Sequence, residues 1–502
     1  MALKVSTRKQ LFIDRKLVAS SEGIIIAANS PRFEGVVLEP GRAGDWDDRI
    51  VGPYGQVMED DGVFRMWLGG HAQNDSHYKL GYAESTDGIH WVKPELGLHE
   101  YNGSRANNLC CKEWGYVFKD PNAPLEEKYR LLVQARHYID GDILDGARGG
   151  FYVLTSPDGL DWTWPDQRVF PFQADTLNQV DYDEHIGRYV AYVRTWPLGF
   201  PRGSALPYGR AVGRIEMDDP CSPWPFDALA EPFLTRTDPP DSIPTVSREV
   251  PTVLEYPGYA DAGNWVDLYT PAVMQYPEAE DAYFAFPSLN CYNPGSEIRN
   301  HSTLNIGMAV SRDGITWDWP SLGPYIPFGE PGSGRSKSLY MLYGAIQTDG
   351  EISQFYAGSD EEHGSGIRAE KRIYRTVQRV DGFVSVDFHS TGGSLTTPAM
   401  ASEGIELILN VDAGSGSGKV AILDESEQPV VGFGFNDCDE IHVDDTAHKV
   451  TWSGKSPGAI LERPVRLQFQ MRNVKLFSFQ LKAAGDSSDS GVRPATLIRN
   501  DE

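Results

Sequence analysis

Ser85-Thr86-Asp87-Gly88-Ile89-His90-Trp91 is the stretch that decides the fold, because the pattern recurs twice in this 502-residue sequence. The copies are Ser156-Pro157-Asp158-Gly159-Leu160-Asp161-Trp162 and Ser311-Arg312-Asp313-Gly314-Ile315-Thr316-Trp317. An Asp-Gly pair suits a tight hairpin turn, since glycine adopts positive φ and aspartate bonds the turn backbone. The tryptophan that follows can pack between neighbouring sheets. Three copies therefore predict a repeated β-unit.

The spacing of these turns predicts five such units. The turns begin at residues 85, 156 and 311, so the second interval is about twice the first. A degenerate copy is expected at 214–219, and a fifth unit ends at 379–383. In the first unit, alternating patterns predict antiparallel strands at 56–59, 63–68, 79–83 and 90–93. Four strands per unit are one blade of a β-propeller, and radial repetition leaves few open edges.

The chain is therefore expected to be all-β, with a five-bladed β-propeller followed by a β-sandwich. The propeller is predicted at 1–382, with the N-terminal segment 1–50 packing on it or closing it. Short apolar patterns between Gly, Asp and Ser turns predict the β-sandwich at 383–485. Residues 486–502, rich in charged and small polar side chains, are expected to form a loose tail.

The net charge of −26 disfavours nucleic acid and anionic membranes as partners, because phosphate binding needs a basic surface. The first residues lack the apolar region of a secretory signal, and no apolar run reaches the roughly 18 residues of a membrane span. We therefore expect a cytoplasmic protein. The five cysteines are scattered and predict reduced thiols, and no metal or cofactor is predicted. The sequence leaves the oligomeric state open.

Polar residues occur where one mouth of such a propeller should lie. The first strand of a blade begins, and the second strand ends, on the same side of the disc. A structural channel would be filled by small or apolar side chains, so polar residues there predict a binding site. The residues expected to contact substrate are Trp46, Asp47, His71, Arg136, His137, Arg194, Tyr269, Tyr340 and His363.

Four carboxylates are candidates for catalysis. Asp175 and Asp267 begin predicted strands and could act as acid or base, although a turn-capping role is the alternative. Asp120 lies in a turn-like Asp-Pro sequence. Glu249 lies in the long connection 220–263 and is the candidate acid, with an ordinary surface residue as the alternative.

The charged and imidazole side chains in this set suggest the kind of ligand. Arg136 and Arg194 end equivalent strands, and guanidinium groups select carboxylate, sulfate or phosphate. Their alternative role is pairing with Asp120 and Asp175. The three histidines His71, His137 and His363 are expected to make separate hydrogen bonds, and they could bind a metal only if they converged.

The repeated turns, Trp91–Gly97 with Tyr101–Ser104 after it, and Lys119-Asp120-Pro121 resemble the clan of five-bladed glycoside hydrolases and their uncharacterised bacterial members. That clan includes arabinanases, xylosidases, invertases, levansucrases and mannoside phosphorylases. The resemblance implies one carboxylate from each of the first three blades, acting as base or nucleophile, as modulator and as acid. Lys119-Asp120-Pro121 is similar to the Arg-Asp-Pro of invertases. Gly52-Pro53-Tyr54-Gly55, however, stands where the first aspartate should be.

We therefore expect a glycoside hydrolase or related carbohydrate-active enzyme, which acts with a carboxylate pair on a saccharide of anionic or furanosidic character. Two alternatives remain open. The missing first-blade aspartate favours a non-catalytic sugar-binding propeller. The common use of propellers with repeated loops favours a protein-interaction scaffold.

Overall fold

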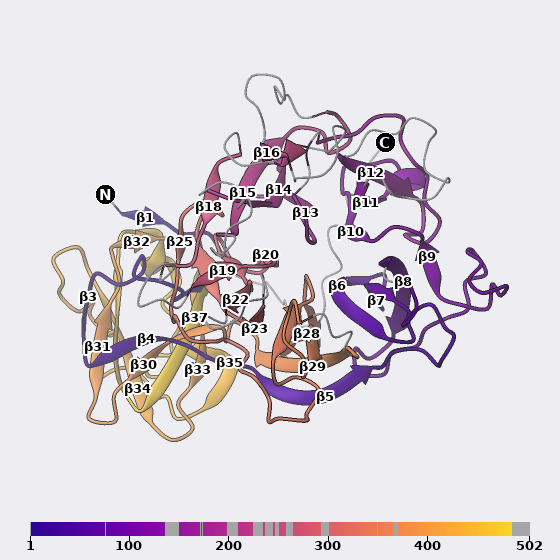
Figure 1. The fold of residues 1–502 in the computed structure, drawn as a ribbon. Coiled ribbons are helices and arrows are strands. Elements are labelled where there is room, and N and C mark those ends of the chain that lie inside the picture. The colour runs from indigo at the N-terminus through magenta and orange to yellow at the C-terminus, as the bar shows by residue number, and fades with distance from the viewer. Residues whose placement is uncertain are drawn as a thin grey trace.

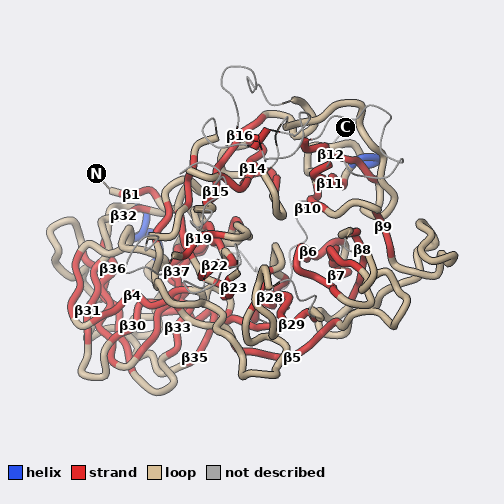
Figure 2. The backbone as a smooth tube through the Cα atoms, in the orientation of Figure 1, coloured by secondary structure: helices blue, strands red, loops and turns tan. Residues whose placement is uncertain are grey.

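The computed structural model describes residues 2–75, 77–135, 150–170, 172, 174–197, 209–223, 234–235, 244–245, 250–257, 265–292, 301–348, 350–365 and 370–483. Within these residues the regular structure is β-strand, apart from short 3₁₀ helices at Leu125–Glu127 and Gly458–Glu462 (Figure 2). The prediction of an all-β protein is confirmed. No helix in the described part of the chain is long and apolar enough to span a membrane.

Consecutive strands form a series of antiparallel sheets. The first sheet contains β6 (Ile50–Asp60), β7 (Val63–His71), β8 (Lys79–Ser85) and β9 (Leu109–Cys111). The second contains β10 (Gly115–Lys119), β11 (Tyr129–Ala135) and β12 (Gly150–Ser156). The third contains β13 (Gln179–Asp183), β14 (Arg188–Thr195), β15 (Ala211–Met217) and β18 (Thr252–Leu254). The fourth contains β20 (Val273–Gln275), β21 (Tyr283–Ala285), β24 (Ala309–Ser311) and β25 (Trp317–Asp318).

An eight-stranded sheet follows in the order β19-β22-β23-β26-β28-β29-β5, with β27 beside β28. Its strands are β19 (Val266–Leu268), β22 (Ser288–Tyr292), β23 (Ser302–Ile306), β26 (Ser338–Met341), β27 (Ile346–Thr348), β28 (Glu351–Ser359), β29 (Arg372–Arg379) and β5 (Arg32–Leu38). Strands β16 (Leu234–Thr235) and β17 (Pro244–Thr245) pair separately. Figure 1 shows the sheets around a common centre, following one another in chain order.

Each of the three repeated turns lies against a neighbouring sheet. Trp67 of the first sheet donates its indole N–H to the carbonyl of Gly159, in the turn of the second, at 2.7 Å. Tyr192 of the third sheet donates its hydroxyl to Gly314, in the turn of the fourth, at 3.1 Å. In the first sheet's own turn, a Cβ on Gly88 would lie 2.5 Å from Ile346, beside the last of these sheets. The three turns therefore contact three different neighbouring sheets, two of them through hydrogen bonds to the turn glycine.

The first sheet also bonds directly to the eight-stranded one. The amide of Val57 donates to the carbonyl of Tyr343, and the amide of Tyr343 donates to Gly55, both at 2.9 Å. A parallel bridge joins Ile50 to Lys371 nearby. The first sheet and the eight-stranded sheet are therefore neighbours.

The fourth strand of the first sheet differs from the prediction. Residues 90–93 do not form a strand, because the Asp87 carboxylate accepts the amides of Ile89 and His90 at 2.8 Å each and holds them in the turn. Val92 and Glu84 exchange two backbone hydrogen bonds of 2.9 Å as an isolated bridge. Strand β9 supplies the edge instead.

Two C-terminal sheets share one apolar core. Leu407 and Phe479 of one sheet pack with Val420 and Phe469 of the other. The first sheet has the order β35-β33-β37-β30-β4, with β2 on β37, and the second has the order β3-β31-β36-β34. Their strands are β2 (Lys9–Leu11), β3 (Ser20–Glu22), β4 (Ile24–Ala28), β30 (Val384–Phe388), β31 (Gly393–Thr396), β33 (Glu406–Asp412), β34 (Ser417–Leu423), β35 (Asp444–Val450), β36 (Arg466–Arg472) and β37 (Val474–Lys482).

The N-terminal strands are divided between these parts of the molecule. Only β5 joins the eight-stranded sheet, where it pairs with β29. Strands β2, β3 and β4 pair with β37, β31 and β30 in the C-terminal sheets. Strand β1 (Leu3–Lys4) pairs in parallel with β32 (Met400–Ala401). Strands β2, β3 and β4 thus extend the C-terminal sheets. The same segment also packs beside the fourth sheet, where Lys9 forms a parallel bridge with Ala279 and Arg312 Nη2 donates to the carbonyl of Leu11 at 2.7 Å.

The docked turns give a prediction for stability. Gly159 has φ +79°, and a Cβ there would lie 2.8 Å from the Trp67 ring. We expect Gly159→Ala to lower the free energy of unfolding by about 3 kcal/mol, because backbone strain and a clash add together. Gly62 is the matched control, since its φ is +78° and nothing lies within 4 Å of its Cβ position. Gly62→Ala should lose about 1 kcal/mol. Equal losses in chemical denaturation would contradict docking through this turn.

Candidate functional site

The structure brings Asp175, Arg194 and Tyr269 together from three separate stretches of chain. Arg194 lies near the end of β14, Asp175 precedes β13 and Tyr269 follows β19. Arg194 Nη1 donates to Asp175 Oδ2 at 3.0 Å, and the guanidinium carbon lies 4.6 Å from the Tyr269 ring centroid. The Arg194 side chain is buried, whereas that of Asp175 is 37% exposed. Asp175 therefore presents an accessible carboxylate held by a buried arginine.

Asp267 forms a second ion pair beside the same tyrosine ring. Its carboxylate, which is 0% exposed, lies 3.3 Å from Arg210 Nη1, and the guanidinium carbon of Arg210 lies 5.2 Å from the Tyr269 centroid. Asn290 Nδ2 and the Tyr292 hydroxyl each donate to this carboxylate at 2.9 Å. Burial alone would lower the pKa of Arg210, but Asp267, together with Tyr292, Tyr269 and Asp175, outweighs burial and raises that pKa. Asp267 thus holds Arg210 in place and has little surface to offer a substrate.

Tyr340 and His363 adjoin Tyr269. The Tyr340 hydroxyl and His363 Nδ1 are 2.9 Å apart, and the His363 ring centroid is 4.6 Å from that of Tyr269. Burial, with the positive charges of Arg210, Lys371 and Arg194, lowers the pKa of His363 to about 3. The imidazole is therefore neutral at pH 7.

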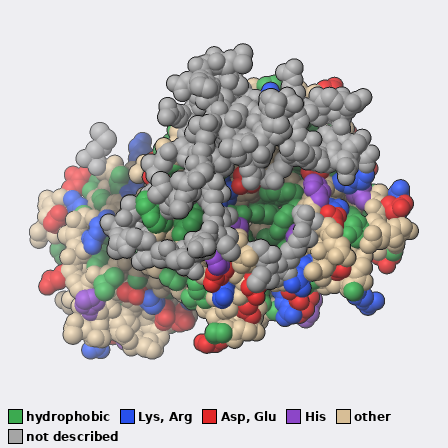
Figure 3. All heavy atoms as spheres, viewed as in Figure 1, with side chains coloured by type: hydrophobic (Ala, Val, Ile, Leu, Met, Phe, Trp, Pro, Cys, Tyr) green, Lys and Arg blue, Asp and Glu red, His purple; other side chains and the backbone are tan. Residues whose placement is uncertain are grey.

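An aromatic group completes the cluster. The Tyr54 and Tyr269 hydroxyls are 3.0 Å apart, and the Tyr54 ring stacks on Trp114 with centroids 4.4 Å apart. Tyr78 packs edge-on against Tyr54 and against His71. On the face in Figure 3, hydrophobic side chains gather near the middle of the molecule, with charged groups around them. Aromatic walls with a few convergent polar groups are typical of small-molecule sites.

The backbone at Asp175 is strained. Asp175 has φ 47° and Thr176 has φ 91°, which is a rare conformation for a β-branched residue. The Gln134 side chain accepts the amides of Ala174 and Asp175 at 3.0 and 2.8 Å, and Asn178 Nδ2 donates to the Thr176 carbonyl at 2.9 Å. Strain of about 1–3 kcal/mol per residue persists where surrounding contacts enforce it, and it clusters at active sites and ligand clamps.

Asp120 lies in a turn, as its Asp-Pro sequence predicted. Strand β10 ends at Lys119, so Asp120 begins the turn to β11 instead of starting a strand. Arg130 Nε donates to its carboxylate at 3.2 Å, and the Tyr189 hydroxyl donates at 2.5 Å. The Asp-Pro sequence accounts for this, since it is a turn former. The structure does not bring Asp120 to Asp175.

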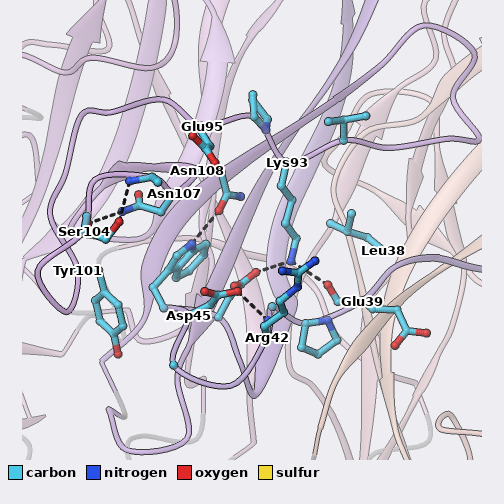
Figure 4. A pocket seen from close by; sticks show the side chains of 18 of the residues that line it. Leu38, Glu39, Arg42, Asp45, Lys93, Glu95, Tyr101, Ser104, Asn107 and Asn108 are labelled. Carbon is cyan, nitrogen blue, oxygen red and sulfur yellow. Dashed lines mark hydrogen bonds and ion pairs between the residues drawn. The ribbon is translucent and has the colours of Figure 1, made fainter.

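Trp46 and Asp47 line a different pocket, of about 790 Å³, beside the first sheet (Figure 4). Trp46 is buried against that sheet and donates its indole N–H to Asn108 Oδ1 at 2.8 Å. Asp47 is paired with Lys93, and both side chains reach the pocket from the loops around it. His71 ends β7 as expected, and its Nδ1 lies 2.8 Å from the Ala72 carbonyl. Arg136, His137 and Glu249 lie outside the described residues.

Sequence reasoning missed Arg210 and Lys371, which both immediately precede the third strand of a hairpin series, β15 and β29. In an antiparallel sheet the third strand begins beside the end of the second. These positions therefore face the same side as the first-strand starts and second-strand ends. A polar residue at such a position was the sequence signal that could have identified them. Tyr54, Tyr78 and Trp114 carried no such signal, because isolated aromatics are common core residues.

No family model matches this chain. It is 31% identical over 145 residues to an uncharacterized protein of Mycobacterium tuberculosis, a match that covers 28% of this chain and 43% of the relative. A protein from a second strain of that species is 30% identical over the same length. The matched segment thus spans less than half of these curated relatives.

The chain also resembles solved structures at low identity. One is a glycoside hydrolase, with TM-score 0.44 and 12% identity, covering 70% of this chain and 92% of that one. Another is an N-acetylgalactosamine deacetylase from F. plautii in complex with blood group B trisaccharide, with TM-score 0.43, 14% identity and coverage of 71% and 96%. A third is a glycosyl hydrolase from Bacteroides ovatus, with TM-score 0.42, 13% identity and coverage of 70% and 94%.

Proposed function

We propose that the protein is a carbohydrate-active enzyme, a glycoside hydrolase or a relative of that class, whose site is the cluster around Asp175 and Tyr269. The observation that carries the proposal is an accessible carboxylate, held by a buried arginine, next to stacked aromatic rings. Aromatic faces can pack on the apolar faces of a sugar ring, and a nearby carboxylate can serve the chemistry of glycosidic bonds.

The proposed architecture is a five-bladed β-propeller followed by a β-sandwich, with the change near residue 382. The repeated docking of turns onto neighbouring sheets supports the propeller, as do the bonds from the first sheet to Tyr343. The common core of the two C-terminal sheets supports the sandwich. In this architecture the Asp175 cluster occupies one mouth of the propeller.

Glycoside cleavage uses a general acid and a second carboxylate that acts as base or nucleophile. The ion pair with Arg194 suits Asp175 to the role of base or nucleophile, because a neighbouring cation favours the ionised carboxylate. Asp267 is assigned a positioning role, since it is fully buried and engaged by Arg210, Asn290 and Tyr292. Glu249 stays the prediction for the acid.

The test is turnover of a panel of oligosaccharides and aryl glycosides, with chromatographic detection of products. We expect cleavage of at least one glycan. The engagement of Asp267 favours one other candidate function, a site that binds sugar without cleaving it. In that case a glycan would raise the melting temperature without any product, because ligands of the folded state increase its stability.

A further inference from the structure

The pocket beside the first sheet lies between two segments of the chain. The first segment, 38–47, precedes β6, and the second, 91–108, precedes β9. Residues of both segments line a space of about 790 Å³, which lies within the range of small-molecule sites (Figure 4). The described residues that line this space do not include any member of the cluster around Asp175 and Tyr269. The pocket is therefore a second candidate site.

Hydrogen bonds join the two segments at two places. Lys93 Nζ donates to the carbonyl of Glu39 at 2.8 Å and to Asp47 Oδ2 at 2.5 Å, as the dashed lines in Figure 4 show. Asn102 Nδ2 donates to the carbonyl of Gly44 at 3.0 Å. All five of these residues line the pocket. The protein itself therefore fixes the shape of the pocket, which lowers the cost of ordering it around a ligand.

Glycines make room for the two buried residues on the inner side of the pocket. A Cβ on Gly81 would lie 2.3 Å from the Trp46 ring, and a Cβ on Gly70 would lie 3.0 Å from it. A Cβ on Gly41 would lie 2.4 Å from Asp47 Oδ1. A larger residue at these positions would displace Trp46 or Asp47, so the close packing here holds the inner wall rigid.

Other lining groups have hydrogen-bonding capacity to spare. Within the described residues, the Arg42 guanidinium, the Glu95 carboxylate and the Tyr101 hydroxyl make no hydrogen bond. A ligand hydroxyl can accept from Arg42 and donate to Glu95, whereas a charged ligand would be repelled by one of the two. Leu38 and Val92 add apolar surface to the same lining. This combination suits a neutral ligand that is rich in hydroxyl groups and has apolar faces.

We propose that this pocket is a second carbohydrate site, which binds a neutral saccharide apart from the Asp175 cluster. The hydroxyls of the sugar bond to Arg42, Glu95 and Tyr101, and its C–H faces pack on the apolar lining. The pocket holds the glycan without cleaving it. This inference goes beyond the proposed function, because the pocket binds a glycan whether or not the Asp175 cluster cleaves one.

The experiment measures binding of neutral hexasaccharides of D-glucose, D-galactose, D-mannose, D-xylose and L-arabinose to the purified protein by calorimetry. We expect at least one of them to bind, and Ala106→Trp to abolish that binding by filling the pocket, which Ala106 lines. Arg42→Met and Glu95→Ala should each weaken it about tenfold, because a hydrogen bond to a charged group is lost. Glu100→Ala is the matched control for Glu95→Ala, since Glu100 is exposed in the same segment.

The outcomes separate this inference from the proposed function. Equal binding by the wild type and Ala106→Trp overturns the pocket as a sugar site, as does a lack of binding by every hexasaccharide. Binding of an oligogalacturonate that Ala106→Trp abolishes, in preference to the neutral sugars, overturns the assignment to neutral saccharides. Cleavage of a glycan without binding that depends on the pocket keeps only the proposed function. Binding that Ala106→Trp abolishes, without cleavage of any glycan, keeps only this inference.

Discussion

Asp175→Asn is expected to lower turnover of any cleaved glycan by at least about a hundredfold, since a positioned acid–base or nucleophilic carboxylate contributes 10²–10⁴-fold or more. The substitution is well matched to its position. Asparagine tolerates the left-handed backbone that Asp175 adopts at φ 47°, and its amide oxygen can still accept a hydrogen bond from Arg194. The melting temperature should therefore stay within about 2 °C of the wild type. The measurements are kcat and KM with calorimetric melting.

Asp61→Asn is the control for that substitution. Asp61 has φ 54° and lies in the exposed turn between β6 and β7. Asp61→Asn therefore makes the same chemical change at a similar backbone conformation, but outside the cluster. Its turnover should equal that of the wild type. Full activity in Asp175→Asn would remove Asp175 from the mechanism, and a lowered melting temperature would assign it to structure instead.

Asp381→Asn is expected to lower the free energy of unfolding by about 3 kcal/mol, as removal of one member of a buried ion pair does. The buried Asp381 carboxylate joins three parts of the molecule. It accepts the Tyr276 hydroxyl at 2.8 Å and the Ser478 hydroxyl at 2.7 Å, and Lys9 lies 3.2 Å away. The loss of unfolding free energy should be near the lower end of the range for buried ion pairs, because Lys9 is partly exposed and keeps Glu278 as a partner. Chemical denaturation measures it.

The control and the pH dependence make this second prediction specific. Asp387 pairs with Lys475 at the surface, where such bridges are worth at most about 1 kcal/mol, so Asp387→Asn should hardly change the free energy of unfolding.

Burial raises the pKa of Asp381, but Lys9, Ser478 and Tyr276 outweigh burial and hold that pKa below the ordinary 3.8. The stabilising effect is therefore present above about pH 4 and is lost as the pH falls through the lowered value. A constant difference between variant and wild type down to pH 2 would contradict the role of this charge.

The repeated turns made the sheets predictable from the sequence, because a Ser-x-Asp-Gly turn is a local structure with its own hydrogen bonds. The Ser85, Ser156 and Ser311 hydroxyls each accept the amide of the turn glycine at 2.9 Å. The predicted strand 63–68 lies inside β7.

The site was predictable only in part. Asp175, Arg194, Tyr269 and Tyr340 were expected near one another from their places at the ends of strands, and the structure brings them together with His363. Asp120 was expected either at the start of a strand or in an Asp-Pro turn, and it lies in the turn that follows β10. The pairing of Arg210 with Asp267 spans 57 residues, and no local pattern reveals such a contact.

The division of the N-terminal strands has a consequence for biosynthesis. Strands β2, β3 and β4 leave the ribosome first, but their partners β37, β31 and β30 are made more than 350 residues later. At roughly 5–20 residues per second, these strands wait for tens of seconds before they can pair. Unpaired edges of that kind invite aggregation, so the nascent chain should depend on a holding chaperone until its last strands emerge.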